Sequence, residues 1–122
     1  MARVVRPGGI IVASEPDWGT LAVNSTDRAA TRALLDTLCD DHIRNGWVGR
    51  ELAALLTSLG LASIEVHPAT LVLRSLPVAL DILGLSEVAD RAPDWLSDLT
   101  ERDTRNGFFA SITGFTVTGR LA

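Results

Sequence analysis

The stretch MARVVRPGG (residues 1–9) runs directly into IIVASE (residues 10–15), and it predicts how the fold begins. Pro7 and the two glycines after it favour the end of a helix over residues 2–6, because proline interrupts a helix and glycine tolerates positive φ. Ile10 to Ser14 has no polar alternation, which is typical of a parallel strand covered on both faces. The stretch therefore predicts the passage from a crossover helix into a central strand of an α/β sheet.

Composition predicts a single domain over residues 1–122. Hydrophobic residues make up 47% of the chain and mean hydropathy is +0.24, which is enough apolar content for a core. The net charge is −4, and the 11 basic residues form no cluster, so we expect no nucleic-acid partner. Cys39 is the single cysteine and no apolar run reaches membrane-spanning length. These features predict a cytoplasmic protein with no internal disulfide and no membrane partner.

The remaining sequence predicts alternating strands and helices. We expect a turn-rich loop over residues 15–19. A helix should follow, capped by residues 24–26 with Asp27 in its first turn, and it should end at residues 45–46. A second helix is expected from about Gly49 to Gly60, on the spacing of its leucines. A strand over residues 64–67 and 70–73, helices from Pro77 to about residue 91 and from Pro93 to about residue 105, and a final strand over residues 108–120 complete the pattern. The first strand of such a sheet would leave an apolar edge that a partner normally covers.

Three segments, in this order, resemble one enzyme family. ARVVRPGG (residues 2–9), NGWVGREL (residues 45–52) with the leucines after it, and GFFAS (residues 107–111) with Gly114-Phe115 are similar to stretches of class I S-adenosylmethionine-dependent methyltransferases of the type 11 kind. The resemblance covers nearly the whole chain. It implies an α/β fold with part of a Rossmann-like methyltransferase sheet. The three strands would be equivalent to the last three of that sheet, with the final one antiparallel between the other two.

The cofactor-binding half of such an enzyme has no counterpart in these residues. The family binds S-adenosylmethionine (S-adenosyl-L-methionine) mainly through a glycine-rich loop after its first strand and an acidic residue after its second. No Gly-x-Gly occurs in this chain, and Pro7-Gly8-Gly9 precedes a strand instead of following one. We therefore assign no cofactor-binding residue, and we expect a truncated transferase that neither binds the cofactor tightly nor turns over alone.

Glu15, Asp17 and Trp18 form the first group of candidate substrate-binding residues. They are expected just beyond the carboxyl end of the first strand, where open α/β sheets place ligands. A carboxylate there would orient an amine or hydroxyl of the substrate or accept its proton, and the indole would form a pocket wall. The alternative is a solvated turn with a packed tryptophan.

Asn45, Trp47 and Arg50 form the second group. The Arg50 guanidinium would hold a substrate carboxylate through two parallel hydrogen bonds, and Trp47 would stack on the substrate. The alternative has Asn45 as a helix stop, Trp47 in the core and Arg50 in solvent. We assign no catalytic residue and no metal site, because His42 and His67 lack ligands at suitable spacing. Cys39 is expected to be packed and unreactive, and Trp95 is a candidate for a lid over the substrate pocket.

Two functions of different classes remain open from the sequence. The first is the substrate-facing C-terminal portion of a methyltransferase acting on a small-molecule methyl acceptor, with the cofactor-binding half expected upstream of these residues. The second is a non-catalytic interaction module that forms a homodimer or pairs with an N-terminal partner chain. A small-ligand carrier built around Trp18 and Trp47 is a further alternative.

Overall fold

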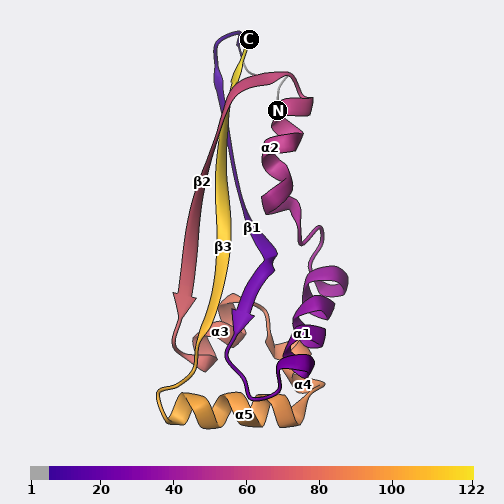
Figure 1. Ribbon diagram of the computed structural model, residues 1–122, viewed down its shortest axis with the longest axis vertical. Coiled ribbons are helices and arrows are strands. Elements are labelled where there is room, and N and C mark those ends of the chain that lie inside the picture. The colour runs from indigo at the N-terminus through magenta and orange to yellow at the C-terminus, as the bar shows by residue number, and fades with distance from the viewer. Residues whose placement is uncertain (1–5) are drawn as a thin grey trace.

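The computed structural model describes residues 6–122, as a long three-stranded sheet with helices at one end and along one side (Figure 1). Of the helix predicted over residues 2–6, residues 2–5 lie outside the described range. Arg6 begins a turn that Gly9 closes by donating to its carbonyl oxygen at 2.8 Å. The helices described are too short or too polar for any of them to cross a lipid bilayer.

The sheet contains β1 (Ile10–Val23), β2 (Leu61–Leu73) and β3 (Ala110–Leu121), in the spatial order β1-β3-β2. β3 lies in the centre and is antiparallel to both neighbours. The prediction that the last strand lies antiparallel between the other two is confirmed. The expectation of a first strand covered on both faces is wrong, because Ile10 and Val12, which share one face of β1, are 56% and 58% exposed.

The predicted loop over residues 15–19 is also wrong, since these residues continue β1. Glu15, Pro16 and Asp17 pair in register with β3 residues 115, 114 and 113. Pro16 is tolerated because β1 is at the edge of the sheet, where a strand needs fewer ladder hydrogen bonds. The turn-forming residues therefore produce a bulge inside a strand and not a loop after it.

This bulge exchanges the two faces of β1. Residues 18–21 lie opposite the single β3 residue Ile112, between the pairs Asp17–Thr113 and Ala22–Ser111. β1 thus has three more residues than β3 in this region. Because side chains alternate between the two faces of a strand and three is odd, odd-numbered side chains of β1 point to one face before the bulge and to the other face after it. Ile11 and Ala13 thus face α2, whereas Val23 shares the other face with its partner Ala110. We call these the α2 face and the opposite face.

The segment after β1 forms two helices with a π-helical turn between them. α1 (Arg28–Thr37) is followed at once by η2 (Leu38–His42), and α2 (Val48–Ser58) begins after the turn at residues 45–46. Asp27 is the N-cap of α1 and not part of its first turn, since its carboxylate accepts from the Ala30 N–H at 2.9 Å. In α2, only Leu52 and Leu56 of the predicted leucine face are buried.

Three helices connect β2 to β3 where two were predicted. α3 (Leu76–Ile82) and α4 (Ser86–Asp90) replace the single helix expected to reach residue 91. The break lies at Gly84, whose φ of +64° ends α3. α5 (Pro93–Thr104) begins at its proline as predicted.

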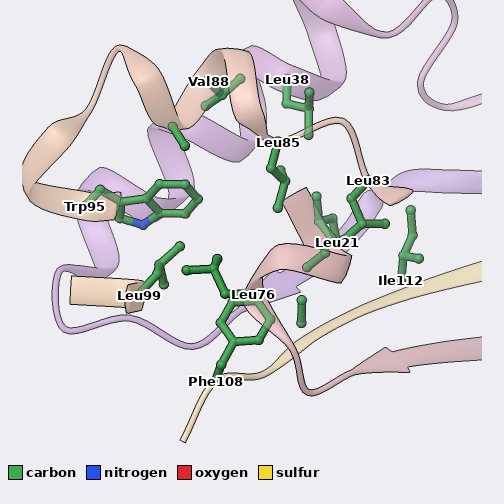
Figure 2. Packing of buried hydrophobic residues seen from close by; sticks show 13 residues of the cluster. Leu21, Leu38, Leu76, Leu83, Leu85, Val88, Trp95, Leu99, Phe108 and Ile112 are labelled. Carbon is green, nitrogen blue, oxygen red and sulfur yellow. The ribbon is translucent and has the colours of Figure 1, made fainter. Parts of the chain in front are cut away.

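The core consists of two clusters on opposite faces of the sheet. The larger one lies on the opposite face where β3 begins, and α1, η2, α3, α4 and α5 enclose it; we call this the helical end (Figure 2). It surrounds the fully buried Phe108, Leu85 and Leu99. The smaller cluster lies on the α2 face at the other end, the α2 end, where Leu52 and Leu56 pack on Ile11 and Val117. The odd-numbered bulge in β1 lets one strand contribute to both clusters.

Candidate functional site

Asp17 and Arg50, one from each predicted group, form a bidentate ion pair. Arg50 donates from Nε to Asp17 Oδ2 at 2.6 Å and from Nη2 to Oδ1 at 3.0 Å. Oδ1 also accepts from the backbone N–H of Gly19 at 3.0 Å. Asp17 is 2% exposed, so its charge is stable there only because these donors replace water. The pair therefore joins the bulge of β1 to the first turn of α2.

Trp47 completes this group by stacking on the guanidinium. The Arg50 carbon Cζ lies 3.9 Å from the centroid of the indole ring, within the range of a cation–π contact. The Asp17 hydrogen bonds raise the pKa of Arg50 above its ordinary value and keep it charged. The Arg50 side chain is still 38% exposed. Among residues 6–122 no group accepts a hydrogen bond from its Nη1, so this nitrogen has no partner within the described structure.

Three glycines allow the backbone to close around this pair. A Cβ on Gly49 would lie 2.7 Å from the carbonyl oxygen of Pro16, and a Cβ on Gly46 would lie 2.5 Å from that of Cys39. A Cβ on Gly19 would overlap Arg50 Nη2. The Trp18 N–H donates to the Gly46 carbonyl oxygen at 2.9 Å along the free edge of β1. Glycine is therefore needed at these positions, because a side chain would collide with neighbouring segments of the protein.

The other predicted residues do not join the group through their side chains. Glu15 is exposed on β1, and Asn45 is exposed in the turn before α2, with φ of +53°. Trp18 turns its side chain toward the cluster at the helical end. The structure thus brings together Asp17, Trp47 and Arg50. Because residues 15–18 lie within a strand, the placement beyond a strand end that singled out Glu15, Asp17 and Trp18 does not hold.

This geometry limits what the group can bind. The Asp17 carboxylate occupies the two nitrogens that would hold a substrate carboxylate, and it neutralises the guanidinium charge. What remains for a ligand is one N–H edge of Arg50 and the half-exposed indole of Trp47. Such a surface can donate a single hydrogen bond to a ligand oxygen beside a flat apolar group.

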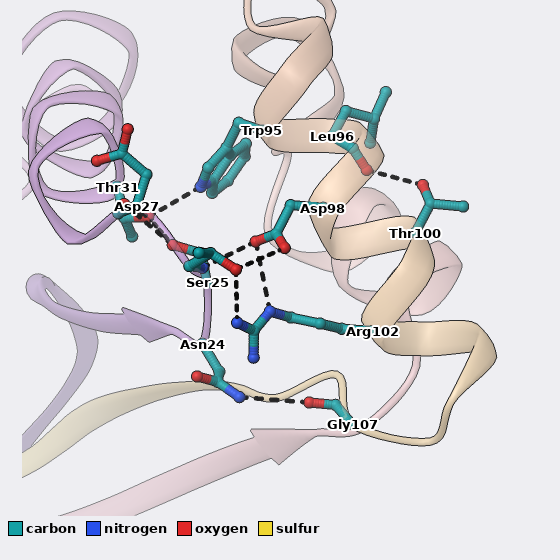
Figure 3. Close-up of polar contacts among 11 residues, drawn as sticks. Asn24, Ser25, Asp27, Thr31, Trp95, Leu96, Asp98, Thr100, Arg102 and Gly107 are labelled. Atoms are coloured by element: carbon teal, nitrogen blue, oxygen red, sulfur yellow. Dashed lines mark hydrogen bonds and ion pairs between the residues drawn. The ribbon is translucent and has the colours of Figure 1, made fainter.

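A polar network at the helical end was not predicted from the sequence (Figure 3). The buried Trp95 donates its indole N–H to Thr31 Oγ1 at 2.9 Å, and Ser25 bonds to the same hydroxyl. Asp98 accepts from the Thr26 N–H and hydroxyl, each at 2.9 Å, and pairs with Arg102. The Thr26 N–H, followed by its hydroxyl and the Arg102 charge, lowers the pKa of Asp98. The four-residue spacing of Asp98 and Arg102 is that of a helical ion pair, but nothing in the sequence indicates Thr26 as a further partner.

Trp95 and Cys39 lie inside the protein. Trp95 is 5% exposed and is held by Thr31, so in the described residues it is a core side chain and not a mobile lid. Cys39 is also buried, as predicted, and burial raises the pKa of its thiol. A high thiol pKa keeps the sulfur protonated and a poor nucleophile. Across residues 6–122 no group of histidine, cysteine and carboxylate side chains could hold a metal ion.

Comparison with known proteins provides one informative relative. No protein-family model matches the chain. The chain is 36% identical over 126 residues to an "Uncharacterized 37.1 kDa protein in transposon TN4556" of Streptomyces fradiae. The match covers 94% of this chain but only 35% of that protein, and the relative's name gives it no activity. The chain is thus similar to about a third of a longer protein.

Proposed function

We propose that this chain is the substrate-facing C-terminal portion of a methyltransferase that uses S-adenosylmethionine, and that it is inactive without a cofactor-binding portion. The parent reaction would be the in-line attack of a substrate oxygen, nitrogen or carbon on the methyl group of the cofactor. Such a transfer depends mainly on positioning and on the exclusion of water, so few obligatory catalytic side chains are expected. The methyl acceptor would be a small molecule.

The observation that carries the proposal is the arrangement of the three strands. The order β1-β3-β2, with a central antiparallel β3, is the arrangement that the resemblance implies for the last three strands of the methyltransferase sheet. An antiparallel sheet made only of hairpins would place sequential strands side by side, whereas here β1 and β2 are separated by β3. The agreement supports the proposal because the expectation came from the family resemblance and used no structural information.

The uncovered edge of β1 also supports a missing portion. At the α2 end, Ile10 and Val12 expose apolar side chains on the opposite face, beside the free edge of the strand. Folded proteins normally cover such an edge, because unpaired backbone groups invite association. The greater length of the Streptomyces relative is consistent with a covering segment encoded in the same chain.

In this proposal the Asp17–Arg50–Trp47 group borders the acceptor pocket. Trp47 and the free edge of Arg50 would contact the acceptor, with Asn45 and Glu15 near the rim, while Asp17 fixes the guanidinium. Trp18 would act through its packing at the helical end. No residue of this chain is assigned to the cofactor.

The exposed edge favours one alternative, a non-catalytic module that pairs through β1 with a second copy or with a separate N-terminal chain. A mass measurement in solution distinguishes this alternative. A homodimer whose dissociation follows disruption of the β1 edge would favour the module. A stable monomer would count against it, and it would also remove the argument from the exposed edge.

The test compares the chain with and without the reading frame upstream of Met1. We expect an in-frame extension of roughly 100 residues with a glycine-rich strand–loop–helix. By calorimetry, the extended protein should bind S-adenosylmethionine at micromolar concentration and the 122-residue chain should not. Micromolar binding by the 122-residue chain would contradict the proposal. So would an extended protein that has no glycine-rich loop and does not bind the cofactor.

A further inference from the structure

We propose that the cleft between α1 and α5 is a binding site for a small molecule that carries an apolar body and one cationic amine. This inference is independent of the methyltransferase proposal, because it depends only on the helical end of this chain. The cleft has a volume of about 750 Å³ and lies where the first turns of α1 and α5 meet. That volume is typical of sites for small organic ligands.

The floor of the cleft is apolar. Ala30 and Leu34 line it from α1, and Ala92, Pro93 and Trp95 line it from the start of α5. Figure 3 shows the Trp95 indole reaching from α5 toward α1, where Thr31 receives its N–H. Because this bond fixes the indole and the alanines are small, the floor is rigid and open. A preformed apolar floor of this kind suits a hydrocarbon or aromatic group.

The charges at the rim determine which polar group the ligand would carry. Arg91 and Asp98 line the cleft, and each forms an ion pair with a residue outside the lining, Glu87 and Arg102 respectively. Asp27 and Asp94 also line the cleft, and neither has an ion-pair partner among the described residues. Two carboxylates therefore remain uncompensated by cations.

The helix ends do not reverse this balance. Asp27 caps α1 and Asp94 lies in the first turn of α5, so each carboxylate is next to the positive end of its own helix. Each helix end is equivalent to roughly half an elementary charge, so two ends offset about one of the two carboxylate charges. The nearby Arg28 lines a different hollow, with Ala22 and Leu35. The rim therefore has a net negative charge, which complements an amine.

The test uses three probes of one shape and different charge: 3-phenylpropylamine, 3-phenylpropanol and 3-phenylpropanoate. Binding is followed by nuclear magnetic resonance, from the chemical-shift changes of N–H groups in the ¹⁵N-labelled protein. We expect the amine to bind with Kd on the order of 1 mM, which is ordinary for a ligand of this size. It should shift the Trp95 indole N–H and the backbone amides of Ala30 and Ala33. The alcohol and the carboxylate should bind at least about fivefold more weakly.

Substitutions assign the effect to the cleft. Asp94→Asn should raise the Kd of the amine about two- to fivefold, and the double change with Asp27→Asn should raise it further. Asparagine also caps helices well, so α1 should survive the Asp27 change. Asp36→Asn is the control, because Asp36 is exposed on α1 and does not line the cleft. Ala33→Phe, at an exposed lining position, should block all three probes without unfolding the protein.

The possible results either support the site or overturn the proposal. Tighter binding of the amine, with shifts confined to α1 and α5, would support the site. The proposal is overturned if the alcohol binds as well as the amine, if the shifts map elsewhere, or if the amine does not bind at 10-fold above about 1 mM. Because no outcome involves S-adenosylmethionine, failure of this site leaves the test of the proposed function unaffected.

Discussion

At the helical end, α1, α3, α4 and α5 enclose Phe108 and its neighbours, whereas at the α2 end one helix covers one face of the same three strands. The opposite face at the α2 end has Ile10 and Val12 in solvent. The same three strands pass through both ends, so the two ends differ in how many helices cover the sheet. The sheet is enclosed by helices at the helical end, and one of its faces is left uncovered at the α2 end.

The largest effect is expected at the helical end, from Phe108→Ala. Phe108 is 0% exposed at the centre of the larger cluster, so truncation leaves a cavity that the surrounding helices cannot fill. The free energy of unfolding should fall by about 3–5 kcal/mol, measured by urea denaturation. Phe109→Ala is the matched control, because Phe109 is 37% exposed and should lose about 1 kcal/mol or less. Equal losses for the two variants would contradict the placement of Phe108 at the centre of the larger cluster.

The next largest effect is expected at the junction of β1 and α2, from Asp17→Ala. The change removes the acceptor of three hydrogen bonds and leaves Arg50 without its partner. We expect a loss of about 2 kcal/mol, reduced from the value for a fully buried pair because water reaches Arg50. Glu15→Ala, two residues earlier on the same strand, should change stability by less than about 0.5 kcal/mol. In a separate variant, Arg50→Lys should lose the two parallel hydrogen bonds to Asp17, because an ammonium lacks the planar guanidinium fork.

A third effect concerns acid stability and Asp98 at the helical end. The Thr26 N–H lowers the pKa of this carboxylate in the folded state below its unfolded value. Asp98 therefore contributes stability above the unfolded pKa of about 3.9, and the contribution is lost as pH falls through the lower folded pKa. Asp98→Asn should lose about 1 kcal/mol at pH 7 and should show a shallower loss of stability below about pH 4. Asp36→Asn should keep the parent's acid profile; an identical profile for Asp98→Asn would exclude this role.

The sequence predicted the elements that depend on local signals. The helix over residues 48–58 followed from its leucine spacing, and the start of α5 followed from Pro93. The position of β3 between the other strands came from the family resemblance. The break at Gly84 was missed because one glycine inside an apolar stretch is also compatible with a continuous helix.

The bulge and the ion pair could not be predicted, because both depend on tertiary pairing. Residues 15–19 have the composition of a turn, and the pairing of residues 15–17 with β3 keeps this segment within a strand. Asp17 and Arg50 were chosen separately as substrate ligands, and nothing in their spacing indicated that each would satisfy the other. The glycines at positions 19, 46 and 49 were the available signal, since Gly46 and Gly49 mark close approaches of two backbone segments and Gly19 leaves room for the Arg50 side chain. Their partners became clear only in the fold.

The smallest effect is expected on the uncovered face at the α2 end, from Val12→Thr. Threonine keeps the β-branched shape, and Val12 is 58% exposed, so the free energy of unfolding of the monomer should change by less than about 0.5 kcal/mol. The same change should weaken any association through β1, because it reduces the apolar surface beside the free edge. Urea denaturation and sedimentation equilibrium measure the two effects separately. A loss above about 1 kcal/mol in the monomer would mean that this face is already packed within the chain. A neutral monomer with reduced association would instead assign the face to a partner, which is the property that distinguishes the α2 end from the helical end.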